Sequence, residues 1–146
     1  MPTDLMASDS TNRDQVADRA GHCCEYCHLP EAYTSLPFQL DHVIAVKHEG
    51  ANNLENLAYA CLHCNSFKGP NLAGFDHERR RTIRLFNLRE DKWSDHFSWK
   101  GPILWPKTFI GRVTIQVLRI NLPDRVAVRE ALIEEGVFPP PDEEGS

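Results

Sequence analysis

The sequence lacks the long apolar run that a membrane-spanning helix needs. Residues 1–15 also lack the basic start and the apolar stretch of a secretory signal peptide, so we expect a cytoplasmic protein with no membrane partner. An apolar fraction of 41% and a charged fraction of 25% are ordinary for a globular chain. A length of 146 residues without an internal repeat predicts one domain.

The sequence has no overall excess of basic residues, because its formal net charge is −5 at pH 7. The charge is uneven, however: residues 65–129 hold 13 Lys and Arg against 6 Asp and Glu, while residues 1–64 and 130–146 are acidic. The middle of the chain can therefore face phosphate, or its acids and bases can pair across a mixed surface. Charge alone favours the second interpretation.

The two ends of the chain have few residues that could build a core. Residues 1–10 are small and polar, and residues 139–146 are rich in proline and acids, so both are expected to be disordered tails. We expect residues 11–138 to form one α+β domain, with a core motif over residues 22–70 and an extension over residues 71–138.

Cysteine is absent from most of the chain, since all five cysteines lie in two short clusters. Cys24 and Cys27 form one C-x-x-C pair, and Cys61 and Cys64 form the other. A secreted disulfide scaffold spreads its cysteines, whereas two such pairs supply the four thiolates of a structural zinc site. Cys23 also stands near Cys27, but the tighter pair matches its partner better, so Cys23 is the spare.

A zinc ion held by four cysteines has no open coordination position, so we expect this ion to stabilise the fold without taking part in catalysis. Three nearby histidines are expected to be exposed or to lie outside the ligand shell: His22, His28 and His63. Three others are expected at the surface: His48, His77 and His96.

The segment between the cysteine pairs predicts a ββα unit. Residues 36–46 are rich in β-branched and apolar side chains and predict a strand, and residues 57–61 predict a second, shorter strand. A short helix over residues 63–68 should follow and end at Gly69.

The flanking segments predict further helices and one hairpin. We expect helices over residues 13–20, 109–120 and 123–135, the last capped by Asn121, and a hairpin over residues 93–105. The last helix is expected to pack through an apolar face made of Val126, Val128, Leu132 and Ile133.

Three residues between or beside the cysteine pairs suit phosphodiester hydrolysis. A neutral histidine such as His42 can deprotonate a water molecule near neutral pH. The hard oxygen ligands of Asp41 and Asn65 suit a divalent cation that stabilises the leaving oxygen. Because neighbouring side chains on a strand point to opposite faces, this arrangement requires a bend or a strand end at Asp41 and His42. Taken singly, each residue also has an ordinary structural explanation as a core, turn or capping residue.

The string LDHVIAVKHEGANNLENLAYACLHCNSFKG resembles the motif of the HNH nucleases, also called ββα-metal or His-Me finger nucleases. The resemblance extends over about residues 22–70 and includes the zinc pairs as well as the D-H, L-E-N-L and C-N-x-x-K-G elements. In this chain Asn65 replaces the last histidine of the family name, and its carbonyl oxygen can still bind a cation.

The resemblance implies a metal-dependent endonuclease with a structural Zn²⁺ and one catalytic cation such as Mg²⁺ or Mn²⁺. It implies that His42 is the general base and that Asp41 and Asn65 bind the catalytic cation. It further implies that Asn56 holds the loop and orients His42, and that Lys68 approaches phosphate.

A basic run follows the motif and has two open interpretations. It can hold the phosphates of a duplex, or it can form a solvated helix face with salt bridges to nearby acids. The run consists of Arg79, Arg80, Arg81 and Arg84.

The sequence therefore predicts an HNH-type endonuclease that hydrolyses DNA. Hydrolysis of RNA, a non-catalytic zinc module that binds nucleic acid or a protein, and a subunit of a larger complex remain alternatives. A protein partner or a homodimer is compatible with the sequence, and no element for recognising a base sequence is identifiable.

Overall fold

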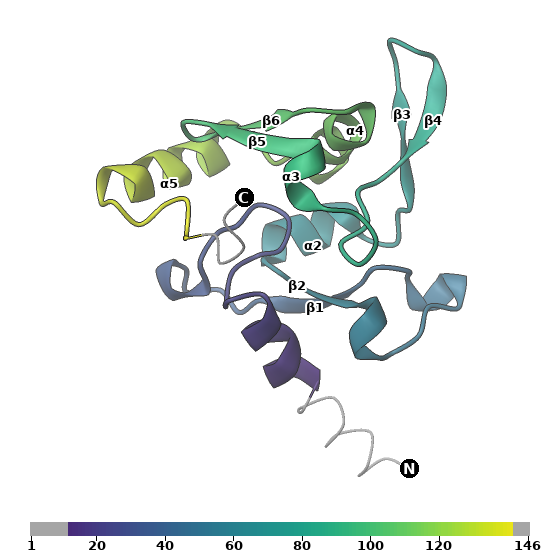
Figure 1. The fold of residues 1–146 in the computed structure, drawn as a ribbon, viewed down its shortest axis with the longest axis horizontal. Coiled ribbons are helices and arrows are strands. Elements are labelled where there is room, and N and C mark those ends of the chain that lie inside the picture. Colours follow the sequence, from purple (N-terminus) through teal and green to yellow (C-terminus); the bar gives the residue numbers. More distant parts are fainter. Residues whose placement is uncertain (1–11, 142–146) are drawn as a thin grey trace.

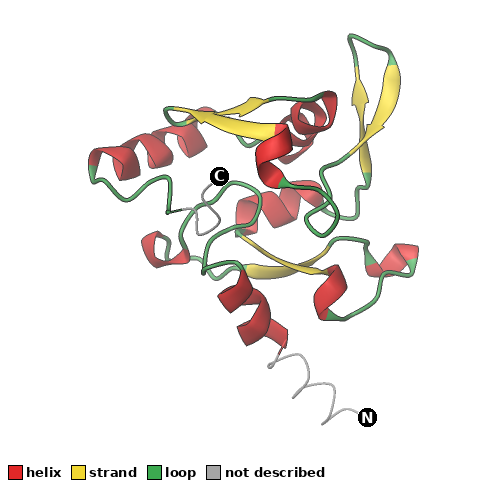
Figure 2. Ribbon diagram, viewed as in Figure 1, coloured by secondary structure: helices red, strands yellow, loops and turns green. Residues whose placement is uncertain are grey.

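The computed structural model describes residues 12–141. The expected tail over residues 1–10 and most of the expected tail over residues 139–146 lie outside that range. The described chain combines helices with three separate two-stranded antiparallel sheets, which confirms the α+β class (Figures 1 and 2). Within that range no helix has the length and apolar character needed to cross a membrane.

The ββα unit is confirmed. β1 (Gln39–His42) pairs antiparallel with β2 (Leu57–Ala60), and α2 (Leu62–Lys68) follows directly. Three short 3-10 helices lie around these strands: η1 (Glu31–Tyr33), η2 (Val46–His48) and η3 (Leu54–Asn56).

The first strand is shorter than expected, because it ends at His42 and not at residue 46. The side chain of Asn56 accepts a hydrogen bond from the Ile44 backbone N–H at 2.8 Å and donates one to the Ile44 carbonyl at 2.9 Å. The backbone groups that would continue the ladder are therefore occupied, and the apolar residues Val43 and Ile44 lie in a loop.

An N-terminal helix covers residues 12–19 of the described chain, as expected, and buries Val16 and Ala17. Gly21 follows with a φ of +64°, a left-handed conformation in which glycine has no steric penalty. Arg19 donates to the carbonyls of Leu54 and Leu57 at 2.9 and 2.5 Å, which fixes the helix to the segment that enters β2.

The extension contains the expected hairpin and both expected helices. The hairpin pairs β5 (Phe97–Lys100) with β6 (Ile103–Pro106), while the segment before it forms the one-turn helix α3 (Trp93–His96). α4 (Phe109–Leu118) begins where the Thr108 hydroxyl accepts from the Gly111 N–H at 3.0 Å. α5 (Pro123–Glu134) is the last element.

Two expectations for α5 are wrong. Asn121 does not cap the helix, because its side chain bonds to the backbone N–H and carbonyl of Leu104 instead. Val128 is 40% exposed, whereas Arg129 is only 2% exposed and donates to the carbonyls of Pro102 and Ile120. The buried face of α5 thus includes a guanidinium group, which also donates to the Asn121 side-chain oxygen at 3.0 Å and so has three acceptors.

Residues 73–84 form a hairpin that the sequence did not predict. It pairs β3 (Ala73–Asp76) with β4 (Arg81–Arg84) and projects from the body of the protein (Figure 1). We call this hairpin the arm. Gly74 allows its close packing on α4, because a Cβ there would lie 2.5 Å from a methyl group of Val113.

The extension also packs on the N-terminal half. The Trp93 indole donates to the Tyr26 carbonyl at 3.1 Å, and Arg89 forms an ion pair with Glu25. A single buried core links the two halves; it includes Phe38, Leu57, Phe86, Phe97, Leu104, Val113 and Leu118.

Candidate metal centre and active-site pocket

The four cysteines assigned to zinc converge in the structure. The sulfur atoms of Cys24, Cys27, Cys61 and Cys64 all lie within 4.8 Å of one another, and all four residues are buried. None of them is in a disulfide. Cys23 lies outside the cluster, with its thiol donating to the Gly21 carbonyl, so Cys24 and not Cys23 belongs to the cluster.

Two local turns bring the sulfur atoms together. In the first turn the N–H of His28 bonds to the Cys24 carbonyl at 2.8 Å, and His28 has a φ of +64°. In the second, Cys61 is the N-cap of α2 and its sulfur accepts from the Cys64 N–H at 3.4 Å. Each pair therefore presents two sulfur atoms on the same side of a turn.

The cluster fits a tetrahedral zinc ion. Zn–S bonds of about 2.3 Å in a tetrahedron place neighbouring sulfur atoms about 3.8 Å apart. The sulfur atoms of Cys27 and Cys61 lie 3.8 Å apart. Hydrogen bonds among the sulfur atoms, that from Cys24 foremost, hold the pKa of the Cys27 thiol well below its usual range. Burial raises the pKa of the Cys24 thiol, and hydrogen bonds with the other sulfur atoms raise that of Cys64. A cation bound at the centre of the cluster would supply the positive charge that stabilises four thiolates together.

The histidines near the cluster lie outside it, as expected. His22 bonds to Asp18 at 3.0 Å, and His28 stacks on Trp93 with ring centroids 4.1 Å apart. His63 lies 3.0 Å from the carbonyl oxygen of Leu118, which fixes α2 against α4.

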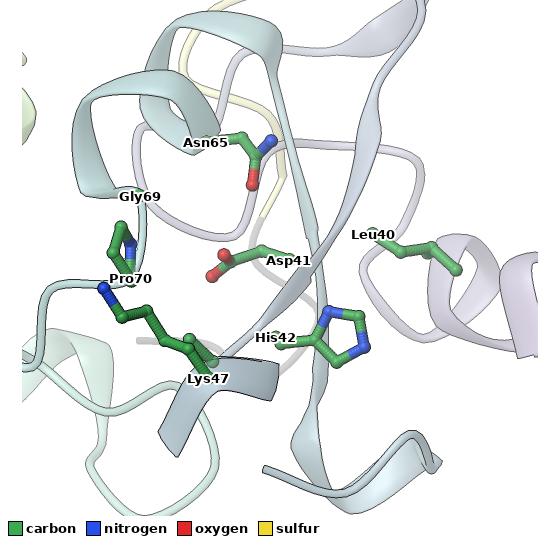
Figure 3. Close-up of a pocket in the computed structure, with 8 residues that line it drawn as sticks. Leu40, Asp41, His42, Lys47, Asn65, Gly69 and Pro70 are labelled. Atoms are coloured by element: carbon green, nitrogen blue, oxygen red, sulfur yellow. The ribbon is translucent and has the colours of Figure 1, made fainter. Parts of the chain in front are cut away.

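An open pocket of about 400 Å³ lies beside the cluster (Figure 3). It contains three residues that the sequence assigns to catalysis: Asp41, His42 and Asn65. The other lining residues are Leu40, Ala45, Lys47, Gly69 and Pro70. The end of β1, the first turns of α2 and the loop after α2 thus meet at one depression.

Asp41 is buried and has one oxygen engaged. Its Oδ2 accepts a hydrogen bond from the Tyr26 hydroxyl at 2.8 Å and lies 3.5 Å from the Lys68 amine. Burial raises the pKa of the Asp41 carboxyl, and the Lys68 ammonium opposes that effect. Within residues 12–141, no hydrogen bond or ion pair reaches Oδ1, so this oxygen could bind a cation.

Asn65 supplies a second oxygen on the same side. It lies in the first turn of α2, and no hydrogen bond within the described chain engages its side-chain amide. Figure 3 shows the Asp41 carboxylate and the Asn65 amide directed toward one another. The carboxylate and amide oxygens are a donor set that fits a Mg²⁺-class cation.

His42 is the last residue of β1, but the strand end does not turn its side chain to the face of Asp41. Its ring lies on the side of the strand opposite the Asp41 carboxylate (Figure 3). The Nε2 atom lies 3.1 Å from Oδ1 of Asn52. In the tautomer with the proton on Nε2, this atom donates to the amide oxygen and Nδ1 is left to accept a hydrogen bond.

Asn56 lies under the loop that carries His42 away from the strand. Besides its two bonds to Ile44, its Nδ2 donates to the Ala51 carbonyl at 2.7 Å. Gly50 makes room for this contact, because a Cβ there would lie 1.7 Å from the Ile44 carbonyl oxygen. Asn56 thus bonds to both ends of the loop over residues 44–51, and it does not line the pocket.

The structure places the two lysines of this region differently. The Lys68 side chain is 3% exposed, and its amine also donates to the His42 carbonyl at 3.2 Å. Lys47 is exposed and lines the pocket. The sequence did not single out Lys47, and its only signal was a basic residue in a loop five positions after His42.

The four arginines of the basic run lie on the arm and not on a helix. Arg79 pairs with Asp76 at 3.3 Å, and Arg84 pairs with Asp91 at 2.6 Å. Arg80 and Arg81 are exposed, and no ion pair within the described residues engages them.

Comparison with known proteins identifies one family. The model of the HNH endonuclease family matches residues 24–71, about a third of the chain. No curated protein and no solved structure gives a match. The matched segment includes both cysteine pairs and the pocket residues, and the members of this family are in general nucleases. Residues 24–71 therefore form a domain of the HNH endonuclease family, with the four-cysteine cluster that is typical of its zinc-binding subtype.

Proposed function

We propose that this protein is an endonuclease that hydrolyses phosphodiester bonds of DNA with one divalent cation. The observation that carries the proposal is the pocket, which is lined by a histidine and by two residues with oxygen ligands from β1 and α2 of an HNH domain: His42, Asp41 and Asn65. Asp41 and Asn65 would hold the cation, which stabilises negative charge on the phosphate and on the leaving 3′ oxygen when bound.

The opposite directions of Asp41 and His42 suit this reaction. In an in-line displacement the attacking water and the leaving oxygen lie on opposite sides of the phosphorus. His42 accepts the proton of the water at Nδ1 on one side, with its ring oriented by Asn52 through Nε2. Asp41 and Asn65 act on the other side, where charge develops on the leaving oxygen.

We assign the two lysines separate roles. Lys68 is enclosed with Asp41, so its ammonium group balances the charge of that carboxylate and positions it. Lys47 is exposed at the pocket, where its ammonium group meets the phosphate backbone. Lys47 therefore takes the phosphate contact that the family resemblance gives to Lys68.

Nicking of supercoiled plasmid by the protein and by His42→Ala tests the proposal. Loss of a general base lowers such a rate roughly 10²- to 10⁴-fold. His48→Ala is the matched control, because His48 is exposed in the neighbouring η2 and does not line the pocket. The metal-free reaction is prepared by omitting Mg²⁺. No chelator is added, because a chelator would also remove zinc.

Equal nicking by the protein and His42→Ala would contradict the mechanism. Cleavage of RNA without cleavage of DNA would change the substrate, and a folded, zinc-loaded protein that cleaves neither would favour the non-catalytic zinc module.

A further inference from the structure

We propose that the arm, residues 73–84, binds a DNA duplex beside the bond that is cut, with Arg80 and Arg81 contacting phosphates. This inference rests on the proposed function and adds a binding surface outside the pocket. It depends on the distribution of charge at the turn between β3 and β4.

Both acids of this turn are engaged within the protein. Oδ1 of Asp76 accepts from the backbone N–H groups of Glu78 and Arg79 at 2.9 and 3.1 Å, and Oδ2 pairs with the Arg79 guanidinium. Glu78 forms two hydrogen bonds with Arg112 of α4, at 2.7 and 2.5 Å. The acids therefore shape the turn and fix it to the body, and neither is left to neutralise a further arginine.

Two arginines of the arm are likewise held in place. The Arg79 guanidinium lies 3.4 Å from the ring centroid of Phe109, in addition to its pairing with Asp76. Arg84 binds both carboxylate oxygens of Asp91, at 2.6 and 2.9 Å. These side chains are not available to a partner without breaking contacts within the protein.

Arg80 and Arg81 differ from them. Both are exposed, and the described residues offer them no ion pair, side-chain hydrogen bond or ring contact. Arg80 has a φ of +56°, which places it at the reversal of the chain. The end of the arm therefore carries two positive charges without internal compensation, a feature suited to phosphate.

The position of the arm connects these charges to the pocket. β3 begins three residues after Pro70, which lines the pocket. Arg80 lies ten positions after Pro70 in the sequence. Because a fully extended chain spans at most about 3.5 Å per residue, the two residues lie at most roughly 35 Å apart. That length corresponds to roughly ten base pairs of duplex DNA. The contact would fall within about one helical turn of the cut.

The arm is a rigid support for such a contact. Gly74 packs against Val113 and Val117 of α4, and Glu78 bonds to Arg112 of the same helix. A surface that is already ordered loses less conformational entropy on binding. Because the contacts go to phosphates and not to base edges, we expect no preference for sequence.

Duplex binding measured by fluorescence anisotropy tests the arm separately from cleavage. All variants carry His42→Ala and are assayed without Mg²⁺ on a 24-base-pair duplex. We expect Arg80→Gln/Arg81→Gln to lower the slope of log K against log salt concentration by about 2 and to weaken binding roughly 10- to 100-fold at 0.1 M salt. Lys92→Gln/Lys100→Gln removes two exposed charges elsewhere and should leave both quantities unchanged.

The outcomes separate the arm from the proposed function. If folded Arg80→Gln/Arg81→Gln keeps the wild-type slope of log K against log salt concentration, the proposed contact between the arm and DNA is overturned. Nicking by the wild-type protein would then still support the nuclease. A wild-type protein that binds the duplex through the arm but cleaves no nucleic acid supports the arm and overturns the nuclease. Failure of the wild-type protein to bind the duplex, or binding of RNA in its place, overturns the duplex contact.

Discussion

The sulfur cluster and the pocket lie side by side in one HNH domain, yet they are built in opposite ways. The cluster consists of four buried soft ligands within 4.8 Å of one another, with no room for a substrate. The pocket is open, and Asp41 and Asn65, which we propose as ligands of a cation, keep oxygen atoms without a partner in the described chain. A closed set of four soft sulfur ligands holds an ion that stabilises the fold. An open set of hard oxygen ligands leaves coordination positions for phosphate.

The two regions are joined at two points. Tyr26 lies between Cys24 and Cys27 and donates to Asp41 at 2.8 Å. Asn65 follows Cys64 directly in α2. Each cysteine pair therefore positions one oxygen ligand of the pocket. The cluster can therefore control the geometry of the pocket without touching a substrate.

Removing a cluster ligand should have the largest effect. We expect Cys27→Ser to lose zinc and most of the free energy of unfolding, because zinc binding contributes on the order of 10 kcal/mol in small zinc domains. Cleavage should be lost with it, since Asp41 and Asn65 lose their support. Zinc content by mass spectrometry and thermal unfolding measure the two effects.

Cys23→Ser is the matched control, because Cys23 is adjacent to the cluster in sequence but outside it in space. It should keep zinc and the unfolding temperature. A Cys27→Ser protein that retains stoichiometric zinc would contradict the assignment.

Breaking the buried pair under the pocket should have the next largest effect. Lys68→Met leaves the 4% exposed Asp41 carboxylate without its cation, a change that costs about 3–5 kcal/mol. Urea unfolding at pH 7 measures the loss, and zinc content should not change. A variant as stable as wild type would show that the pair contributes nothing.

The pH dependence of this variant has a definite sign. Burial already raises the pKa of Asp41, and removing Lys68 raises it further. A carboxyl whose pKa is higher in the folded state binds protons more strongly there, so it destabilises the fold increasingly as pH rises. The deficit of Lys68→Met should therefore be constant above the folded pKa of Asp41 and shrink as pH falls through that pKa toward the lower pKa of the unfolded state.

Lys68 also shows where prediction from sequence ends. The cysteine pairs, the strands and α2 were predictable because their signals are local: C-x-x-C spacing, β-branched runs and a glycine stop. The partner of Lys68 is 27 residues away in the sequence, and no spacing rule reports that the two side chains are enclosed together. The resemblance to the HNH motif therefore identified Lys68 as a site residue but did not show that it is buried against Asp41.

The wrong expectations have two causes. The first strand ends early because Asn56 takes the backbone groups of Ile44, and α5 buries Arg129 because distant carbonyls satisfy it. The arm was missed because its strands are only four residues long and lack an alternation of apolar residues. The first two features depend on contacts between segments that are far apart in the sequence, whereas the arm is local but has a weak sequence signal.

Tyr26→Phe should have the smallest effect on stability and the most specific effect on the pocket. It removes one hydroxyl that bonds to a buried carboxylate, which costs about 1.5–3 kcal/mol, while zinc should stay bound. Tyr59→Phe is the matched control, because its hydroxyl also bonds to a carboxylate, that of Glu31 at 2.6 Å, without contacting Asp41.

The readouts of Tyr26→Phe distinguish positioning from stability. The Tyr26 hydrogen bond lowers the pKa of Asp41, so its loss should shift the acidic limb of the cleavage rate to higher pH. The Mg²⁺ concentration for half-maximal nicking should also rise, because Asp41 is held less firmly. Tyr59→Phe should change neither quantity. Equal pH profiles and equal Mg²⁺ requirements for Tyr26→Phe and Tyr59→Phe would contradict the proposed link from the zinc cluster to Asp41. The pair Cys24 and Cys27 would then support the fold only.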